Sequence, residues 1–295
     1  MGLLVTENTE KDYGIERLGT AKMNVLYKYC DQGVAKILES LELKLPYISQ
    51  TNDPLECLPF FYCTNDKAAI EARYLSALGR RNMSPPADYK HKLNEQFEKG
   101  EIQKHLVESQ RELQREWNRR KGCLLSVSKN AQETVMWAHY ADKHKGAAIG
   151  IDLDNVFPDA HRERGILMDP VIYDKHRPKI NILEEPEGNI SNEAYRKAIM
   201  TKSDSWTYEE EFRTIFLVDS LEKLRQQGLA HLKDFNGKKT WFLRLNPVSI
   251  REVIFGLYTD KSLKSVIRKL IERQDLQHVK LRQAEESETY TLNLK

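Results

Sequence analysis

The sequence has few cysteines, almost no net charge and no long apolar run, and each absence excludes a class of protein. Four cysteines in 295 residues are too few for a disulfide scaffold, so we expect reduced thiols. The 46 basic and 44 acidic side chains leave a net charge of +2, which excludes a uniformly basic nucleic-acid-binding coat but allows a local basic face. No apolar run approaches the roughly 20 residues of a membrane span, and the first residues lack the pattern of a secretory signal. We therefore expect a cytoplasmic protein without membrane association.

Common catalytic signatures are also missing. The sequence contains no G-x-x-x-x-G-K-[ST] loop, no G-x-G-x-x-G after a strand, no G-x-S-x-G elbow and no H-E-x-x-H pair. Cys57 and Cys63 are too far apart for a thiolate knuckle, and buried thiols are the favoured interpretation. The spacing of His139 and His144 is not the usual helical metal-binding pair, so no metal is expected.

What the sequence does contain is an irregular alternation of short strands and helices. β-branched and aromatic residues predict strands at 23–30, 44–49, 123–128, 147–154, 165–174, 212–218, 239–246 and 250–256. Helical spacing predicts helices that begin at Asp31 and that span 133–146, 191–202 and 262–273, before two edge strands within 278–294. Because the regular βαβα rhythm is absent, we predict an α+β fold of mixed, mostly antiparallel small sheets flanked by helices.

Two segments differ from this pattern. Residues 1–20 are polar and aperiodic, which predicts a flexible N-terminal segment before a single α+β domain at 21–295. Within that domain, residues 64–122 are highly charged and favour helix, with one break at 83–86. We expect a helical insertion there, with Gly122 as its C-cap. The insertion is a candidate surface for a protein partner.

The most informative motif runs from Lys202 to Arg213 and leads three consecutive glutamates into a strand. On extended backbone, Glu209, Glu211 and Arg213 point to one face. Such a group can form an ion-pair ladder or hold a metal ion through oxygens. It can also bind a sugar hydroxyl and stabilise positive charge at an anomeric carbon. All three interpretations remain open, and Trp206 adds an aromatic pocket candidate beside the group.

A second motif lies in the predicted helix 133–146. Trp137, Tyr140 and His144 share a broad face that can stack a planar ring and offer a titratable group. The alternative is that Trp137 and Tyr140 belong to the core while the histidines, His139 included, lie at its rim.

Two shorter motifs complete the candidate set. Asn52, Asp53 and Glu56 follow the second predicted strand, where they form either an ordinary turn or the mouth of a pocket. Lys28 and Tyr29 lie on the first strand, where aromatic pairing is the ordinary interpretation. In the functional interpretation, Lys28 contacts phosphate as a point charge.

Taken in order, these motifs resemble the bacterial domain of unknown function 2971 family. The shared pattern is L-Y-K-Y, N-D-P-x-E, M-W-x-H-Y-x-x-x-H-x-G, K-x-x-x-W-x-Y-E-x-E-F-R and I-x-E-V-I-F-G, and it extends over roughly 23–294. The resemblance implies a bacterial cytoplasmic protein from phage-defence or toxin-like loci. It implies no activity.

A more distant likeness is to the ADP-ribosyltransferase arrangement, in which NAD lies in a cleft between two small sheets. The likeness implies that Glu211 is the catalytic carboxylate at the ribose 2′-hydroxyl and that Glu209 orients the acceptor. It also implies a set of NAD-binding residues, namely Lys28, Tyr29, Trp137, Tyr140 and Arg213. The chain departs from the pattern because Lys28 replaces a His or Arg, and because Ser126 and Ser128 only partly replace a serine-threonine-serine strand.

Three hypotheses about function follow. The first is an NAD-using ADP-ribosyltransferase-like enzyme of a bacterial defence or toxin-like system, with a protein or nucleic acid as acceptor. The second is a metal-dependent nucleic-acid hydrolase that uses Asp53, Glu56, Glu209 and Glu211. The third is a sensor or interaction module without catalysis. Convergence of the candidate residues on one cleft would favour an active site.

Overall fold

An eight-stranded sheet forms the centre of the computed structural model, which describes residues 25–156, 166–184 and 192–295. The strand order is β15-β14-β13-β5-β1-β4-β10-β6, and every neighbouring pair is antiparallel except β13 with β14. The strands are β1 (Leu26–Cys30), β4 (Gly122–Ser128), β5 (Ala147–Ile151), β6 (Ile166–Pro170), β10 (Glu211–Leu217), β13 (Ile250–Phe255), β14 (Lys280–Glu285) and β15 (Asn293–Leu294). The predicted α+β fold with mostly antiparallel pairing is confirmed.

Three smaller sheets surround this one. One is antiparallel and contains β11 (Ala230–Phe235), β12 (Lys238–Arg244) and β2 (Glu42–Leu45). The other two are parallel pairs, β3 (Phe60–Tyr62) with β8 (Lys179–Asn181) and β7 (Ile172–Asp174) with β9 (Thr201–Ser203). These pairs join segments that lie far apart in the sequence, and β9 brings Lys202 beside the start of β10.

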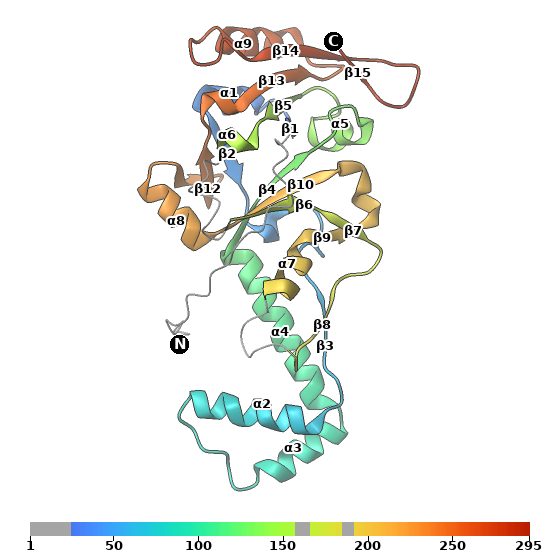
Figure 1. Ribbon diagram of the computed structural model, residues 1–295, viewed down its shortest axis with the longest axis vertical. Helices are drawn as coiled ribbons and strands as arrows, with labels where there is room; N and C mark the ends of the chain where they lie inside the picture. The colour runs from blue at the N-terminus through green and yellow to red at the C-terminus, as the bar shows by residue number, and fades with distance from the viewer. Residues whose placement is uncertain (1–24, 157–165, 185–191) are drawn as a thin grey trace.

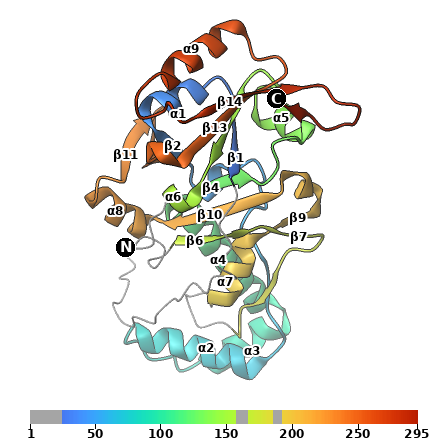
Figure 2. The same ribbon diagram turned by 45° about the horizontal axis from the view of Figure 1, so that its top comes forward.

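Helices cover both faces of the large sheet (Figure 2). On one face, α1 (Val34–Ser40) and α9 (Lys261–Ile271) pack on alternate residues of β5, including Ile149. On the other face, α5 (Thr134–Tyr140) packs on Ala148 and on its neighbours in the sheet. Three further helices are α6 (Leu153–Val156), α7 (Asn192–Met200) and α8 (Val218–Gln226), and short 3₁₀ helices span Ile48–Gln50, Asp204–Glu209 and Pro247–Ser249.

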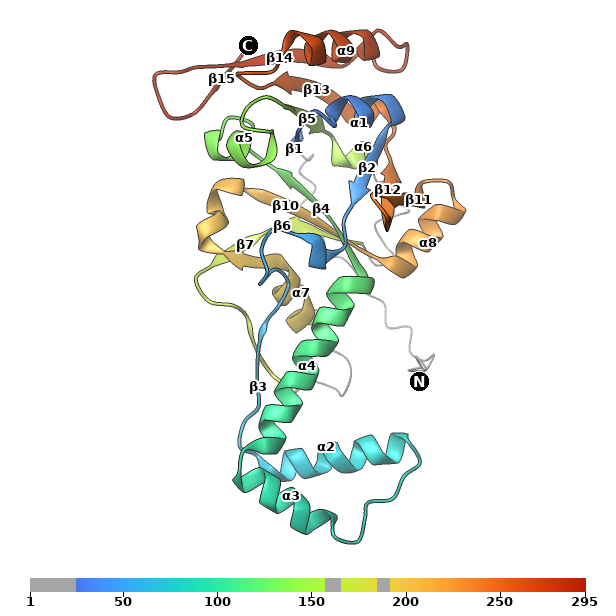
Figure 3. The ribbon, with the colours of Figure 1, turned by 180° about the vertical axis from the view of Figure 1, so that it is seen from behind.

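A helical arm projects from the sheet (Figures 1 and 3). It comprises α2 (Lys67–Arg80), α3 (Tyr89–Glu98) and α4 (Glu101–Arg120), and it occupies the predicted insertion. In addition to the predicted break at 83–86, Gly100 in the left-handed region (φ 69°) separates α3 from α4. The predicted cap at Gly122 is wrong, because this residue is the first of β4. Its missing side chain leaves room for the Trp117 ring, 2.6 Å from where a Cβ would lie.

Other boundaries also differ from the prediction. The helix predicted at 133–146 ends at Tyr140 because Asp142, Lys143 and His144 adopt left-handed φ angles of 46°, 54° and 68°. The strand predicted at 44–49 stops before Pro46, and α1 begins at Val34 rather than after an Asp31 cap. No elements were expected at α8 or β11. The flexible segment predicted at 1–20 lies outside the described residues. No helix in the described ranges is long and apolar enough to cross a membrane.

Candidate functional site

A cavity opens where β1 and β4 diverge. The two strands share one paired position, Tyr27 with Ser128. Beyond this position the two strands separate. β1 stays paired with β5, and β4 stays paired with β10. The cavity holds about 780 Å³ of space when its open mouth is included. Its lining includes nine of the predicted site residues, namely Lys28, Tyr29, Asn52, Asp53, Glu56, Tyr140, Trp206, Glu209 and Glu211.

Glu211 and Arg213 form the buried base of this site. The Arg213 side chain has no exposed surface and donates to both carboxylate oxygens of Glu211, from Nε and Nη2, at 2.9 Å each. Its Nη2 also donates to Glu56 Oε1 at 2.6 Å, and its Nη1 donates to the Ile199 carbonyl at 2.5 Å. A further hydrogen bond of 2.6 Å runs from Ser126 Oγ to Glu211 Oε1. These contacts fix the orientation of the Glu211 carboxylate.

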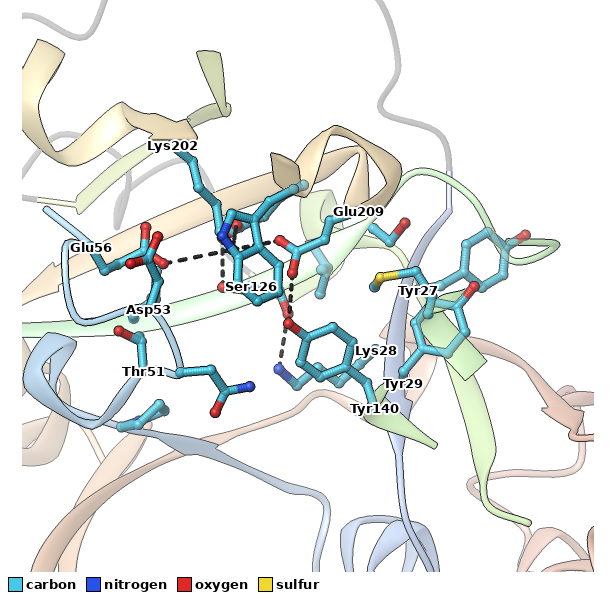
Figure 4. A pocket seen from close by; sticks show the side chains of 18 residues that line it. Tyr27, Lys28, Tyr29, Thr51, Asp53, Glu56, Ser126, Tyr140, Lys202 and Glu209 are labelled. Atoms are coloured by element: carbon cyan, nitrogen blue, oxygen red, sulfur yellow. Dashed lines mark hydrogen bonds and ion pairs between the residues drawn. The ribbon is translucent and has the colours of Figure 1, made fainter. Parts of the chain in front are cut away.

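Lys202 lies among three carboxylates. Its Nζ is 2.5 Å from Glu209 Oε2, 3.2 Å from Glu211 Oε2 and 3.6 Å from Glu56 Oε2. The same ammonium lies 4.9 Å from the centre of the Trp206 ring. Figure 4 shows the side chains of Lys202, Glu209 and Tyr140 pointing toward one another. Two cations, Lys202 and Arg213, therefore neutralise most of the charge of three glutamates.

Burial and ion pairing act in opposite directions on these groups. Burial alone would raise the pKa of Glu211, but the Arg213 guanidinium, the Lys202 ammonium and the Ser126 hydrogen bond outweigh it and hold that pKa well below its usual range. Burial alone would lower the pKa of Lys202, yet the surrounding glutamates raise it above its usual value. Burial raises the pKa of Glu56, and its cationic neighbours offset this only in part. Glu211 is thus ionised at neutral pH.

Two side chains approach these carboxylates from the opposite wall. Tyr140 OH, at the end of α5, donates to Glu209 Oε1 at 2.6 Å. Lys28 occupies the gap between the diverging strands and donates from Nζ to the Ser126 carbonyl at 2.9 Å. Burial lowers the pKa of Lys28. An anionic ligand group in the gap would offset this desolvation, because it would favour the charged ammonium.

The backbone delivers Glu209 to the cavity by a route different from the one predicted. Glu209 is not on an extended strand but ends a 3₁₀ helix, and Glu210 follows in the left-handed region with φ 42°. This kink turns the Glu210 side chain away, toward Asn130 Nδ2 at 2.9 Å. Glu209 and Glu211 therefore reach the same cavity despite the irregular backbone.

Three predicted residues lie outside the cavity lining. Trp137 has no exposed surface, and its indole Nε1 donates to the Ala131 carbonyl at 2.9 Å. Its ring packs edge-on against Tyr29 in the core, so it is not available to stack on a ligand. His139 lies at the rim with Nδ1 3.2 Å from Tyr208 OH, and Arg213 lies behind Glu211.

Sequence reasoning missed two residues that shape the site. Lys202 begins the K-x-x-x-W motif, but the motif alone does not indicate that its ammonium pairs with the glutamates a few residues later. Tyr173 belongs to none of the motifs, and its hydroxyl accepts from the backbone N–H of Glu211 at 2.8 Å. No local pattern marks Tyr173, because this segment lies beside Glu211 only through the pairing of β6 with β10.

Residues 136–214 match the model of a family described as "Protein of unknown function (DUF2971)". This segment is similar to the DUF2971 family. The match confirms the family resemblance predicted from the motifs. The DUF2971 segment begins in α5 and ends in β10, so it includes Tyr140, Lys202, Glu209 and Glu211. No curated protein and no solved structure matches the chain.

Ion pairs engage the glutamates of the cavity. In the part of the chain that the structure describes, no three His, Cys, Asp or Glu side chains are arranged to hold a metal ion. The glutamates of the cavity are instead bonded to Lys202 and Arg213. The arrangement provides one fixed, ionised carboxylate beside a partly apolar cavity.

Proposed function

We propose that the protein is an NAD-dependent ADP-ribosyltransferase-like enzyme whose cavity binds NAD. The observation that carries the proposal is the Glu211 carboxylate, which is buried, ionised and oriented by Arg213 and Ser126 at the wall of a cavity between two diverging strands. A preorganised anion in such a position is suited to stabilise positive charge that develops in a bound sugar.

In the proposed reaction, a nucleophilic atom of the acceptor forms a bond to C1′ of the nicotinamide ribose. The bond from C1′ to the nicotinamide nitrogen breaks, and nicotinamide leaves with the bonding electron pair. The acceptor's proton passes to water or to Glu209. The ribose carries positive charge in the transition state, so Glu211 beside the 2′-hydroxyl stabilises that state more than the ground state.

The other lining residues have consistent roles in this proposal. Met136, Tyr140 and Trp206 provide apolar and aromatic walls for the planar nicotinamide. Lys28 provides a cation for a phosphate of NAD in the gap between β1 and β4. Arg213 acts as a positioning residue, because it contacts Glu211 rather than the ligand.

The alternative of a metal-dependent nucleic-acid hydrolase is less well supported. A divalent ion at Glu56, Glu209 and Glu211 would have to displace the Lys202 ammonium, which lies within 3.6 Å of all three carboxylates. The interaction-module hypothesis accounts for the buried Arg213 network as a structural element. It gives no reason for a cavity next to that network.

The first test compares NAD binding and nicotinamide release in the wild type, Glu211→Gln and Glu210→Gln. Glu210 is the matched control because it is the adjacent glutamate and its carboxylate is bonded to Asn130. We expect Glu211→Gln to lose about 10²–10³-fold in turnover, the scale of one preorganised electrostatic contact, while Glu210→Gln stays near wild type. Wild-type turnover that survives in Glu211→Gln would overturn the assignment.

A second variant separates loss of chemistry from loss of folding. Ser126→Ala removes the hydrogen bond to Glu211 without removing a charge, so it should reduce turnover with little effect on thermal unfolding. If Glu211→Gln does not fold stably, the turnover of Ser126→Ala tests the proposal in its place. Absence of saturable NAD binding to the folded wild type at millimolar NAD would also reject the proposal.

A further inference from the structure

We propose that a second groove, next to the cavity, binds a single strand of nucleic acid. Its role as the acceptor site rests on the proposed function, but the binding itself does not. The groove holds about 1280 Å³ with its open side included. It shares four lining residues with the cavity, namely Asp53, Glu56, Lys202 and Trp206. These four residues separate the two spaces, so a strand in the groove would lie directly beside the cavity.

One segment of the groove lining is basic. Lys175, Arg177 and Lys179 line it within five residues, between β7 and the start of β8. No ion pair joins Lys175 or Lys179 to a carboxylate elsewhere in the ranges that the structure describes. The opposing charges in the groove are Asp53 and Asp174, since Glu56 and Lys202 are bonded within the buried network. The cations of this segment are therefore available for phosphate groups.

The groove also offers aromatic faces beside these cations. Phe60 is 42% exposed, and the Arg177 guanidinium lies 5.7 Å from the centre of its ring. Trp206 lies at the boundary with the cavity. From there the aromatic rim continues through Tyr208, 6.1 Å from Trp206 between ring centres, to His139, 5.9 Å further. Cations next to exposed aromatic faces are the combination by which proteins hold single-stranded nucleic acid.

This combination favours an unpaired polynucleotide over other anions. A duplex hides its base faces, so it would use only the cations. An acidic peptide would pair with the lysines but gain little from Phe60 and Trp206. A strand in the groove would also place the nucleophilic atoms of its bases near the entrance to the cavity, where the proposed reaction needs them.

The test measures fluorescence anisotropy of labelled oligonucleotides of about 12 nucleotides with the full chain in the absence of NAD. Arms with RNA and with DNA of the same sequence distinguish the two sources of the strand. If the three cations of the groove neutralise three phosphates, the logarithm of the association constant should fall with the logarithm of the salt concentration with a slope of about −2. The matched control is Lys264→Ala with Lys269→Ala on α9, which covers the opposite face of the sheet.

The groove variants should change both affinity and salt dependence. Lys175→Ala with Lys179→Ala should make the slope shallower by about 1.4, because two phosphate contacts are lost. Phe60→Ala should weaken binding about tenfold, as expected for one lost stacking contact, with the slope unchanged. The α9 control should bind as the wild type does. Nicotinamide release without acceptor should stay unchanged in all of these variants.

Several results would overturn the proposal. They are equal weakening by the α9 control, equal binding of a duplex of the same length, and competition by polyglutamate as effective as that by the oligonucleotide. Oligonucleotide binding without NAD turnover would leave the groove standing and reject the proposed enzyme. NAD turnover without oligonucleotide binding at low salt would reject the groove alone.

Discussion

Arg213 determines the geometry of the candidate site although it does not line the cavity. Its guanidinium bonds Glu211 from the same strand, Glu56 from the turn after β2, and the Ile199 carbonyl from α7. Only arginine can make these contacts together, because its planar fork presents several N–H groups in fixed directions. One buried side chain thus holds three separate segments around the carboxylate on which the proposed chemistry depends.

This role predicts the effect of a conservative substitution. Arg213→Lys keeps the charge but can satisfy only part of the network, which leaves buried acceptors without partners. We expect a loss of about 3 kcal/mol in the free energy of unfolding, near the cost of breaking a buried ion pair. Urea denaturation measures it. The matched control is Arg225→Lys, whose pair with Glu222 is exposed, and which should change stability by less than about 1 kcal/mol. Equal effects of the two changes would contradict the role.

At the residue scale, site residues within continuous motifs could be predicted from the sequence. Site residues that come from distant segments through tertiary contacts could not. Glu209, Glu211 and Tyr140 lie in continuous motifs and all three line the cavity, although Glu209 reaches it from a 3₁₀ helix and not from the predicted extended strand. Trp137 lies in the same motif as Tyr140, yet it faces the core, since periodicity assigns a helix face but not what that face contacts. Tyr173 could not be predicted, because its contact with Glu211 depends on the pairing of β6 with β10, which joins distant segments.

At the scale of elements, the segment after α5 shows where local rules fail. Its residues have good helical spacing, but three successive left-handed residues end the helix and lead into Gly146. Tertiary contacts account for this choice: a Cβ on Gly146 would lie 2.0 Å from the Cys30 carbonyl oxygen. The close approach of this turn to the end of β1 favours the turn over a longer helix, and no helix propensity could indicate it.

Two glycines therefore should respond in opposite ways to the same substitution. Gly146→Ala forces Cβ against backbone, which cannot move aside as a side chain can, so we expect a loss of about 3 kcal/mol or more. Gly79, near the end of α2, has no atom within 4 Å of its added Cβ. Gly79→Ala should gain roughly 0.5–1 kcal/mol from helix propensity. Both values come from urea denaturation, and a tolerated Gly146→Ala would show that β1 and this turn are not in close contact.

At the scale of the whole molecule, the fold class followed from the sequence but the large sheet did not. Short strands with irregular helices predicted α+β architecture, which the structure confirms. The sequence did not indicate that eight strands join one sheet, because pairings such as β1 with β5 connect distant segments. It also could not indicate the divergence of β1 from β4, and that divergence creates the cavity.

The buried charges give the whole molecule a specific dependence of stability on pH. The pKa of Glu211 is lower in the folded state than its unfolded value of about 4.3. Its contribution to stability is therefore fully present above about pH 4.3 and is lost as pH falls toward the folded pKa. Lys202 behaves in the opposite sense: its raised pKa stabilises the fold below about pH 10.4, and the contribution is lost at higher pH. The raised pKa of Glu56 opposes the Glu211 effect.

Comparison of the wild type with Glu211→Gln isolates the contribution of Glu211. The difference in melting temperature between the two should be nearly constant from about pH 5 to 9, where Glu211 is ionised in both the folded and unfolded wild type. Below about pH 4.3 the difference should shrink, since the unfolded wild type gains a proton that the substituted amide side chain cannot bind. Glu210→Gln, measured over the same range, controls for the general effect of acid. A difference that stays constant down to about pH 3 would mean that the Glu211 charge is not stabilised by Arg213 and Lys202, and the ionised carboxylate on which the proposed catalysis rests would lose its physical basis.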